Sequence, residues 1–145
     1  MEFVVMFSMC PEARVAESIA RHLVDERLAA CGNVVPGGTS VYRWRGVVHT
    51  EPEVLLILKT RASLVADCVR RIRALHPYEL PEIVAVPIIG GLPAYLDWIR
   101  SGTRGARRGG RSRGDSAPGT HGAGQNPPRR TPGARGRSRG PGGGR

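Results

Sequence analysis

The chain has 145 residues and a mass of 15.6 kDa, which corresponds to one domain of ordinary size. Its formal charge of +10 lies at one end, because residues 102–145 hold 11 of the 22 basic residues and one acid, Asp115. Residues 1–101 balance 11 basic against 11 acidic residues, so the isoelectric point near 11.1 reflects residues 102–145 alone.

The composition excludes several classes of protein. No run of 18 apolar residues occurs, so the sequence predicts no membrane-spanning helix. The first residues lack the basic region and the cleavage pattern of a secretory signal. Cys10, Cys31 and Cys68 are odd in number and show no paired spacing, which argues against a disulfide scaffold and predicts a reducing, cytoplasmic compartment.

Hydrophobic periodicity predicts that the chain begins with a strand and a helix. Residues 3–7 form a short apolar run that is typical of a strand. Pro11 and Glu12 suit a helix start, and an apolar stripe then runs from Val15 to Leu28 at spacings of three to five residues. Gly32 is predicted to close this helix as the C′ residue.

A hairpin is predicted next. Residues 33–35 and 40–45 read as one strand, interrupted by Pro-Gly-Gly at 36–38, which is typical of a bulge. Gly46 supplies the turn, after which residues 47–49 and 53–60 form a third strand.

A second helix, a fourth strand and a short third helix complete the predicted elements. The second helix covers residues 64–75 and ends before Pro77, because proline disfavours helical backbone at the residue preceding it. Residues 83–89 are predicted as an apolar strand and residues 94–99 as a final helix.

The order β-α-β-β-α-β predicts an α+β fold, the split βαβ arrangement with an antiparallel sheet and both long helices on one face. Its strands are apolar at odd and even positions alike, so the second face of the sheet also needs a cover. A monomer would expose an unusually large apolar patch, and residues 1–101 are therefore expected to form an obligate oligomer. Residues 102–145 hold no apolar side chain larger than alanine and are expected to be disordered.

Five motifs carry a family resemblance that covers residues 3–101. They are Leu28–Pro36, Ser40–Gly46, Glu53–Thr60, His76–Ile83 and Tyr95–Ile99. Together they resemble the CutA divalent-cation-tolerance family. The resemblance implies a ferredoxin-like subunit in a homotrimer, assembled in a PII-like way, with a cytoplasmic role linked to copper and other divalent metals and no established enzymatic activity.

The resemblance also implies a candidate metal site at His76. The family's copper-ligand proposal combines a cysteine at the end of the first strand with histidines before the Pro-Tyr pair. In this chain Ser8 stands where that cysteine is expected, Cys10 lies two residues later, and only His76 precedes Pro77. Imidazole and thiolate together suit copper or zinc, but the four-ligand spacing of a structural zinc site is absent. We expect weak binding of copper or another divalent cation at His76, whose alternative role is to interact with the helix dipole.

The proline-rich segment 76–82 offers a second candidate site. Tyr78 and Glu82, together with Lys59, are expected either to converge on a small ligand at a subunit cleft or to pair across the trimer interface. We favour the interface role, because buried ion pairs between subunits often fix geometry.

Catalysis is poorly supported by the sequence. It contains no nucleophile elbow, P-loop, GxGxxG or HExxH motif, and the glycines at 37–38 precede no helix. Trp44 and Trp98 are expected to be packing anchors. We therefore predict a protein that is not an enzyme.

The basic segment 102–145 suggests an alternative function. Its arginine-glycine stretch from Arg104 to Gly114 resembles segments that bind single-stranded nucleic acid through charge and stacking, although it holds no aromatic residue. A coding bias toward arginine, glycine and proline would produce the same composition. The alternative hypothesis is a nucleic-acid-associated protein that presents basic tails, with non-specific adhesion to polyanions as the more general expectation.

Overall fold

A computed structural model describes residues 1–105, and the predicted disordered tail lies outside the described residues from residue 106 onward. Its elements follow the predicted order. They are β1 (Phe3–Cys10), α1 (Ala13–Asp25), β2 (Cys31–Trp44), β3 (Val47–Arg61), the 3₁₀ turn η1 (Ala62–Leu64), α2 (Val65–Leu75), β4 (Ile83–Pro87) and α3 (Pro93–Gly102).

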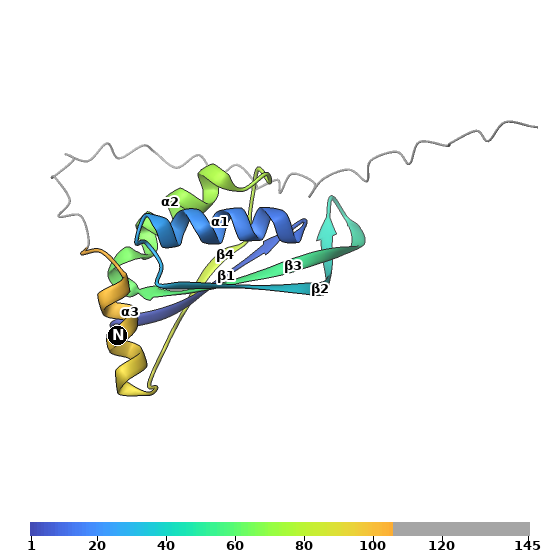
Figure 1. The fold of residues 1–145 in the computed structure, drawn as a ribbon. Coiled ribbons are helices and arrows are strands. Elements are labelled where there is room, and N and C mark those ends of the chain that lie inside the picture. Colours follow the sequence, from blue (N-terminus) through green and yellow to red (C-terminus); the bar gives the residue numbers. More distant parts are fainter. Residues whose placement is uncertain (106–145) are drawn as a thin grey trace, which may run out of the picture.

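The strands form one four-stranded sheet in the order β2-β3-β1-β4, and all three neighbouring pairs are antiparallel. Figure 1 shows α1 and α2 together on one side of this sheet and α3 at one of its ends. This arrangement confirms the predicted α+β fold with both long helices on one face.

The end of α1 differs from the sequence prediction. The helix stops at Asp25, and Arg27 adopts the left-handed conformation, with φ of 56°. The backbone N–H groups of Arg27 and Leu28 then bond the carbonyls of Val24 and Leu23, at 3.0 and 2.9 Å, which is a Schellman C-cap. The prediction of Gly32 as the C′ residue is wrong, because Arg27 takes that role.

The β2–β3 hairpin confirms the predicted bulge and turn. The register of β2 against β3 shifts between Val35 and Gly38. Arg45 and Gly46 both have positive φ, which is the two-residue type I′ turn that matches strand twist. Between Val54 and the turn, the hairpin has no third strand beside it in the described part of the chain, since β1 pairs only with residues 54–61 of β3.

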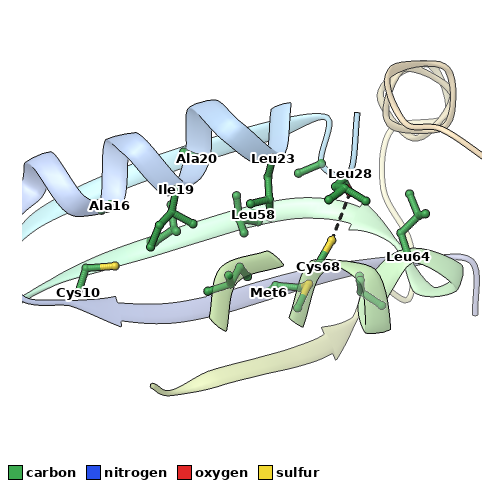
Figure 2. Close-up of a cluster of buried hydrophobic side chains, with 14 of the residues drawn as sticks. Met6, Cys10, Ala16, Ile19, Ala20, Leu23, Leu28, Leu58, Leu64 and Cys68 are labelled. Atoms are coloured by element: carbon green, nitrogen blue, oxygen red, sulfur yellow. Dashed lines mark hydrogen bonds between the residues drawn. The ribbon is translucent and has the colours of Figure 1, made fainter. Parts of the chain in front are cut away.

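The hydrophobic core lies between the two long helices and the sheet. Figure 2 shows Ile19 and Leu23 of α1 directed toward Leu58 of β3 and toward Met6 of β1. The Cys68 thiol of α2 donates a hydrogen bond of 3.3 Å to the Leu28 carbonyl, which ties α2 to the segment after α1.

The opposite side of the sheet carries apolar side chains that α1 and α2 do not cover. We call this surface the open sheet face. Its residues alternate along β1 and β3 with those buried under the helices, and the strand register places the β4 residues beside them. They are Val5, Phe7, Met9, Leu55, Ile57, Val84 and Val86. The prediction of two apolar sheet faces is therefore confirmed.

The last two elements have different bounds from those predicted. β4 ends at Pro87, and Ile89, which was placed in this strand, is exposed. α3 runs to Gly102, and the next residue, Thr103, is buried and accepts a hydrogen bond from Arg61 at 2.9 Å. The folded part thus extends past the predicted boundary at residue 101.

Candidate functional site

His76 directly follows α2, where Pro77 prevents the helix from continuing. Its side chain is only 6% exposed. Nε2 lies 2.8 Å from the Met9 carbonyl, and Nδ1 accepts a hydrogen bond of 3.1 Å from the Tyr78 backbone N–H. These partners assign the neutral tautomer with its proton on Nε2, so both ring nitrogens are engaged within this chain.

Tyr78 connects His76 to a buried carboxylate. Its ring lies 4.7 Å from the His76 ring, centroid to centroid, and its hydroxyl donates a hydrogen bond of 3.0 Å to Glu53 Oε2. Glu53 is 2% exposed, although it stands near the end of the apolar stretch of β3. We call His76, Tyr78 and Glu53 the His76 cluster.

Glu53 was not singled out as a site residue from the sequence. The available signal was an acidic residue directly before the apolar run Val54–Leu58. A buried carboxylate is costly unless it is hydrogen-bonded, so such a position is a candidate for a polar site.

Cys10 is buried at the end of β1, close enough to Glu53 for the carboxylate charge to act on it. Burial, with a further contribution from Glu53, raises the pKa of the Cys10 thiol to about 11. A thiol with this pKa is protonated at neutral pH, whereas a metal ligand must be a thiolate. Ser8 is also buried on this strand.

The described residues contain no group of three or more His, Cys, Asp or Glu side chains that could hold a metal ion. His76 could contribute a ring nitrogen only if one of its two hydrogen bonds were given up. The residues of a single chain therefore fit a weak cation contact better than a preformed cage.

Within the chain, Lys59 lies away from the His76 cluster. Lys59 lies on β3, six residues beyond Glu53, where it pairs in register with Cys31 and donates a hydrogen bond to the Asn33 side chain. Since an extended strand rises about 3.3 Å per residue, Lys59 lies about 20 Å from Glu53 along β3. Glu82 is exposed and precedes β4.

The two tryptophans differ in their surroundings. Trp44 is buried at the end of β2, with the Arg45 guanidinium 5.4 Å from its ring centroid. Trp98 is 48% exposed on α3 and stacks on Tyr95 at 5.5 Å. Trp44 is thus buried as a packing anchor would be, whereas Trp98 is about half exposed within a single chain.

Comparison with known proteins agrees with the fold and the motifs. The family model described as "CutA1 divalent ion tolerance protein" matches residues 4–102. The divalent-cation tolerance protein CutA of Thermus thermophilus is 52% identical over 103 residues, which are 71% of this chain and 99% of that relative. The human Protein CutA is 44% identical over 97 residues, or 67% of this chain, but the match spans only 54% of its own length.

Solved structures give the same result. CutA from Xylella fastidiosa superposes with a TM-score of 0.70 at 46% identity, covering 72% of this chain and 100% of that one. The Cut A1 protein of Thermus thermophilus gives a TM-score of 0.68 at 51% identity, with the same coverage. Among the described residues no helix is long and apolar enough to cross a membrane.

Proposed function

Because the chain belongs to the CutA1 divalent ion tolerance family, we propose that it acts as a homotrimer in the tolerance of copper and other divalent cations. It does so by binding and signalling rather than by catalysis. The observation that carries the proposal is that the open sheet face is left uncovered in a single chain. The His76 cluster lies at the end of the strands that form this face.

Assembly follows from the energetics of that face. Val84 is 46% exposed in a single chain, and Val86 beside it is exposed as well. Each buried apolar side chain contributes about 1.5–3 kcal/mol, so covering this face with a second copy stabilises the protein substantially. The free part of the β2–β3 hairpin presents further exposed valines to a neighbour: Val41, Val47 and Val48.

Assembly also supplies what a single chain lacks for cation binding. One chain offers His76 and Glu53, with the thiol of Cys10 protonated. Ligands from a neighbouring subunit would complete a copper or similar site, because imidazole, carboxylate and thiolate all bind such ions. A single subunit is expected to bind such ions weakly, because it supplies too few ligands.

The remaining candidate residues belong to the subunit interface. We propose that Glu82, which is exposed here, and Tyr78 pair with basic groups across the trimer, and that Lys59 lies in the same interface. The three cysteines are free thiols, which is typical of the reducing cytoplasm where we place the protein.

Copper titration of the full chain tests the cation proposal. His76→Ala should weaken Cu(II) binding about tenfold or more, the size of effect known for residues that support a metal site. His22→Ala is the matched control, because His22 is exposed on α1 and its ring bonds the Ser18 carbonyl of the same helix. Cys10→Ser should weaken binding only if the thiol replaces the ligand missing at Ser8.

Circular dichroism of each variant separates lost binding from lost folding. Equal copper affinity in folded His76→Ala, His22→Ala and unmodified protein would contradict the role of His76. It would leave His76 with the structural role that its two hydrogen bonds describe.

A further inference from the structure

A cavity of about 300 Å³ lies on the helical side of the protein, away from the open sheet face. Its walls come from three segments: the end of α1, the outer side of α2, and the residue that follows Thr103. Five charged side chains line it: Glu26, Asp67, Arg70, Arg71 and Arg104. In Figure 1 the chain after α3 turns back toward the side of the sheet that carries α2.

The backbone of Arg104 is fixed at this wall. Its N–H donates a hydrogen bond of 2.8 Å to the Arg27 carbonyl, and its carbonyl accepts one from the Arg61 guanidinium. Arg61 also binds both the hydroxyl and the carbonyl of Thr103. The side chain of Arg104 is thereby presented to the cavity from an ordered segment.

The guanidinium of Arg104 is poorly compensated in this position. Its Nε is shielded from water and has no hydrogen-bond partner among the residues that the structure describes. Its terminal nitrogen is 4.0 Å from Asp67 Oδ2, which is too long for a hydrogen bond. The side chain as a whole is 32% exposed, so a ligand in the cavity would reach the terminal nitrogens beside Nε and give them the close acceptor that Asp67 does not provide.

The other charges of the cavity are already matched. Arg71 donates from Nε to both oxygens of Glu26, at 3.0 and 2.8 Å, and Arg70 forms an ion pair with Asp67. Two acids therefore balance two arginines, and Arg104 supplies one excess positive charge. The cavity suits a single oxyanion group with one negative charge.

We propose that this cavity binds a phosphate group, as a phosphodiester of single-stranded nucleic acid or as free phosphate. Guanidinium groups match the geometry of phosphate oxygens, and three of them converge here. The sequence favours the polymer, because the chain beyond Gly105 contains ten arginines and one acid. A polyanion attracted by these arginines meets Arg104 where the basic sequence joins the folded domain.

The Nε–H resonance of Arg104 in ¹⁵N–¹H spectra of the full chain gives a direct test. It is assigned by its loss in Arg104→Gln, and its shielding from water favours slow exchange. A short oligothymidine should shift it, and inorganic phosphate should shift it at higher concentration. Sodium chloride of equal ionic strength should not. If phosphate alone shifts it, the source is the free ion.

Two results would overturn the proposal. One is an Arg104 resonance that neither phosphate nor oligothymidine shifts while the oligonucleotide is bound. The other is a shift caused by polyglutamate but not by oligothymidine, which would make the cavity a carboxylate site for an acidic partner.

Affinity measurements with a matched variant give the second test. Arg104→Gln should weaken oligothymidine binding at low salt about tenfold, as expected for one lost charge-assisted hydrogen bond. It should also reduce the slope of log affinity on log salt by about 0.7. Arg73→Gln removes the same charge from an exposed position on α2 outside the cavity. Equal affinities for the two variants would contradict a site at Arg104.

Discussion

Tyr78 shows how one hydroxyl supports a buried charge. Its O–H donates to Glu53, which is almost fully buried, and its backbone N–H donates to His76. A buried glutamate is tolerated in this position because the segment after α2 brings the Tyr78 hydroxyl to it as a hydrogen-bond donor. Hydrogen bonds to charged groups contribute more than neutral ones, so this contact is stabilising.

Tyr78→Phe should therefore lower the free energy of unfolding by about 1–3 kcal/mol. Tyr95→Phe is the matched control, because Tyr95 is exposed on α3 and stacks on Trp98 through its ring, which phenylalanine keeps. Chemical denaturation of both variants measures the difference. An equal loss in both would show that the bond to Glu53 contributes nothing of its own.

The buried thiol of Cys68 makes the stability of the protein depend on pH in the alkaline range. Burial raises the pKa of its thiol from about 9 to about 11, as it does for Cys10. Between pH 9 and pH 11 the thiol loses its proton in the unfolded chain but keeps it in the folded protein. Rising pH therefore favours the unfolded state. The stability should fall from pH 9 to pH 11 by about 1 kcal/mol per pH unit for each buried thiol.

Denaturant titrations over this pH range check the prediction. Cys68→Ala should make the fall in stability less steep, while Cys31→Ala, which alters a half-exposed side chain, should leave the steepness unchanged. Identical pH profiles in both variants would mean that Cys68 ionises alike in the folded and unfolded states.

At the scale of elements, α1 and β2 approach each other unusually closely at Gly32. A Cβ added there would lie 2.8 Å from the Ala20 Cβ and 3.2 Å from a methyl group of Leu58. The glycine that the sequence suggested as a helix terminator is thus required for packing of α1 on the sheet. Its backbone has no left-handed conformation that would demand glycine.

Gly32→Ala should destabilise the protein by about 1–3 kcal/mol, the usual cost of overpacking a core. Gly90→Ala is the control, because nothing lies within 4 Å of the Cβ it would add. Thermal unfolding of the two variants compares them directly. A Gly32→Ala protein as stable as Gly90→Ala would show that α1 can shift away from β2 without cost.

The order and type of these elements could be predicted because each has a regular apolar pattern or a turn residue, such as Gly46. The end of α1 could not, because Leu28 continues the helical spacing although it packs into the core from a loop. Arginine in a left-handed cap, as at Arg27, carries no sequence signal. The fold was therefore more predictable than its boundaries.

The candidate site was less predictable than the fold. His76 and Tyr78 stand close together in a recognisable motif, but their partner Glu53 comes from another strand. Only the sheet register brings β3 to the end of β1, and no local pattern contains that information. Lys59 was assigned to the same site because of its charge, but it lies six residues along β3 from Glu53 and therefore far from the His76 cluster.

At the scale of the whole molecule, charge and apolar surface occupy different places. The helical side carries the arginines of the Arg104 cavity, and the chain continues from there into its basic sequence. The open sheet face lies on the other side and is apolar. A trimer built on that face would leave the three Arg104 cavities outside the interface, and their joint presentation would raise the effective concentration of binding groups for a polyanion.

The assembly prediction follows from the same separation of surfaces. The full chain should sediment as a trimer at micromolar concentration, and Val84→Glu should dissociate it, because a carboxylate in an apolar interface would be buried without a partner. Val24→Glu is the matched control: Val24 is 39% exposed on α1, close to the 46% of Val84, but lies on the helical side. We expect it to remain trimeric. A folded, monomeric full chain, or equal dissociation by both substitutions, would contradict assembly through the open sheet face.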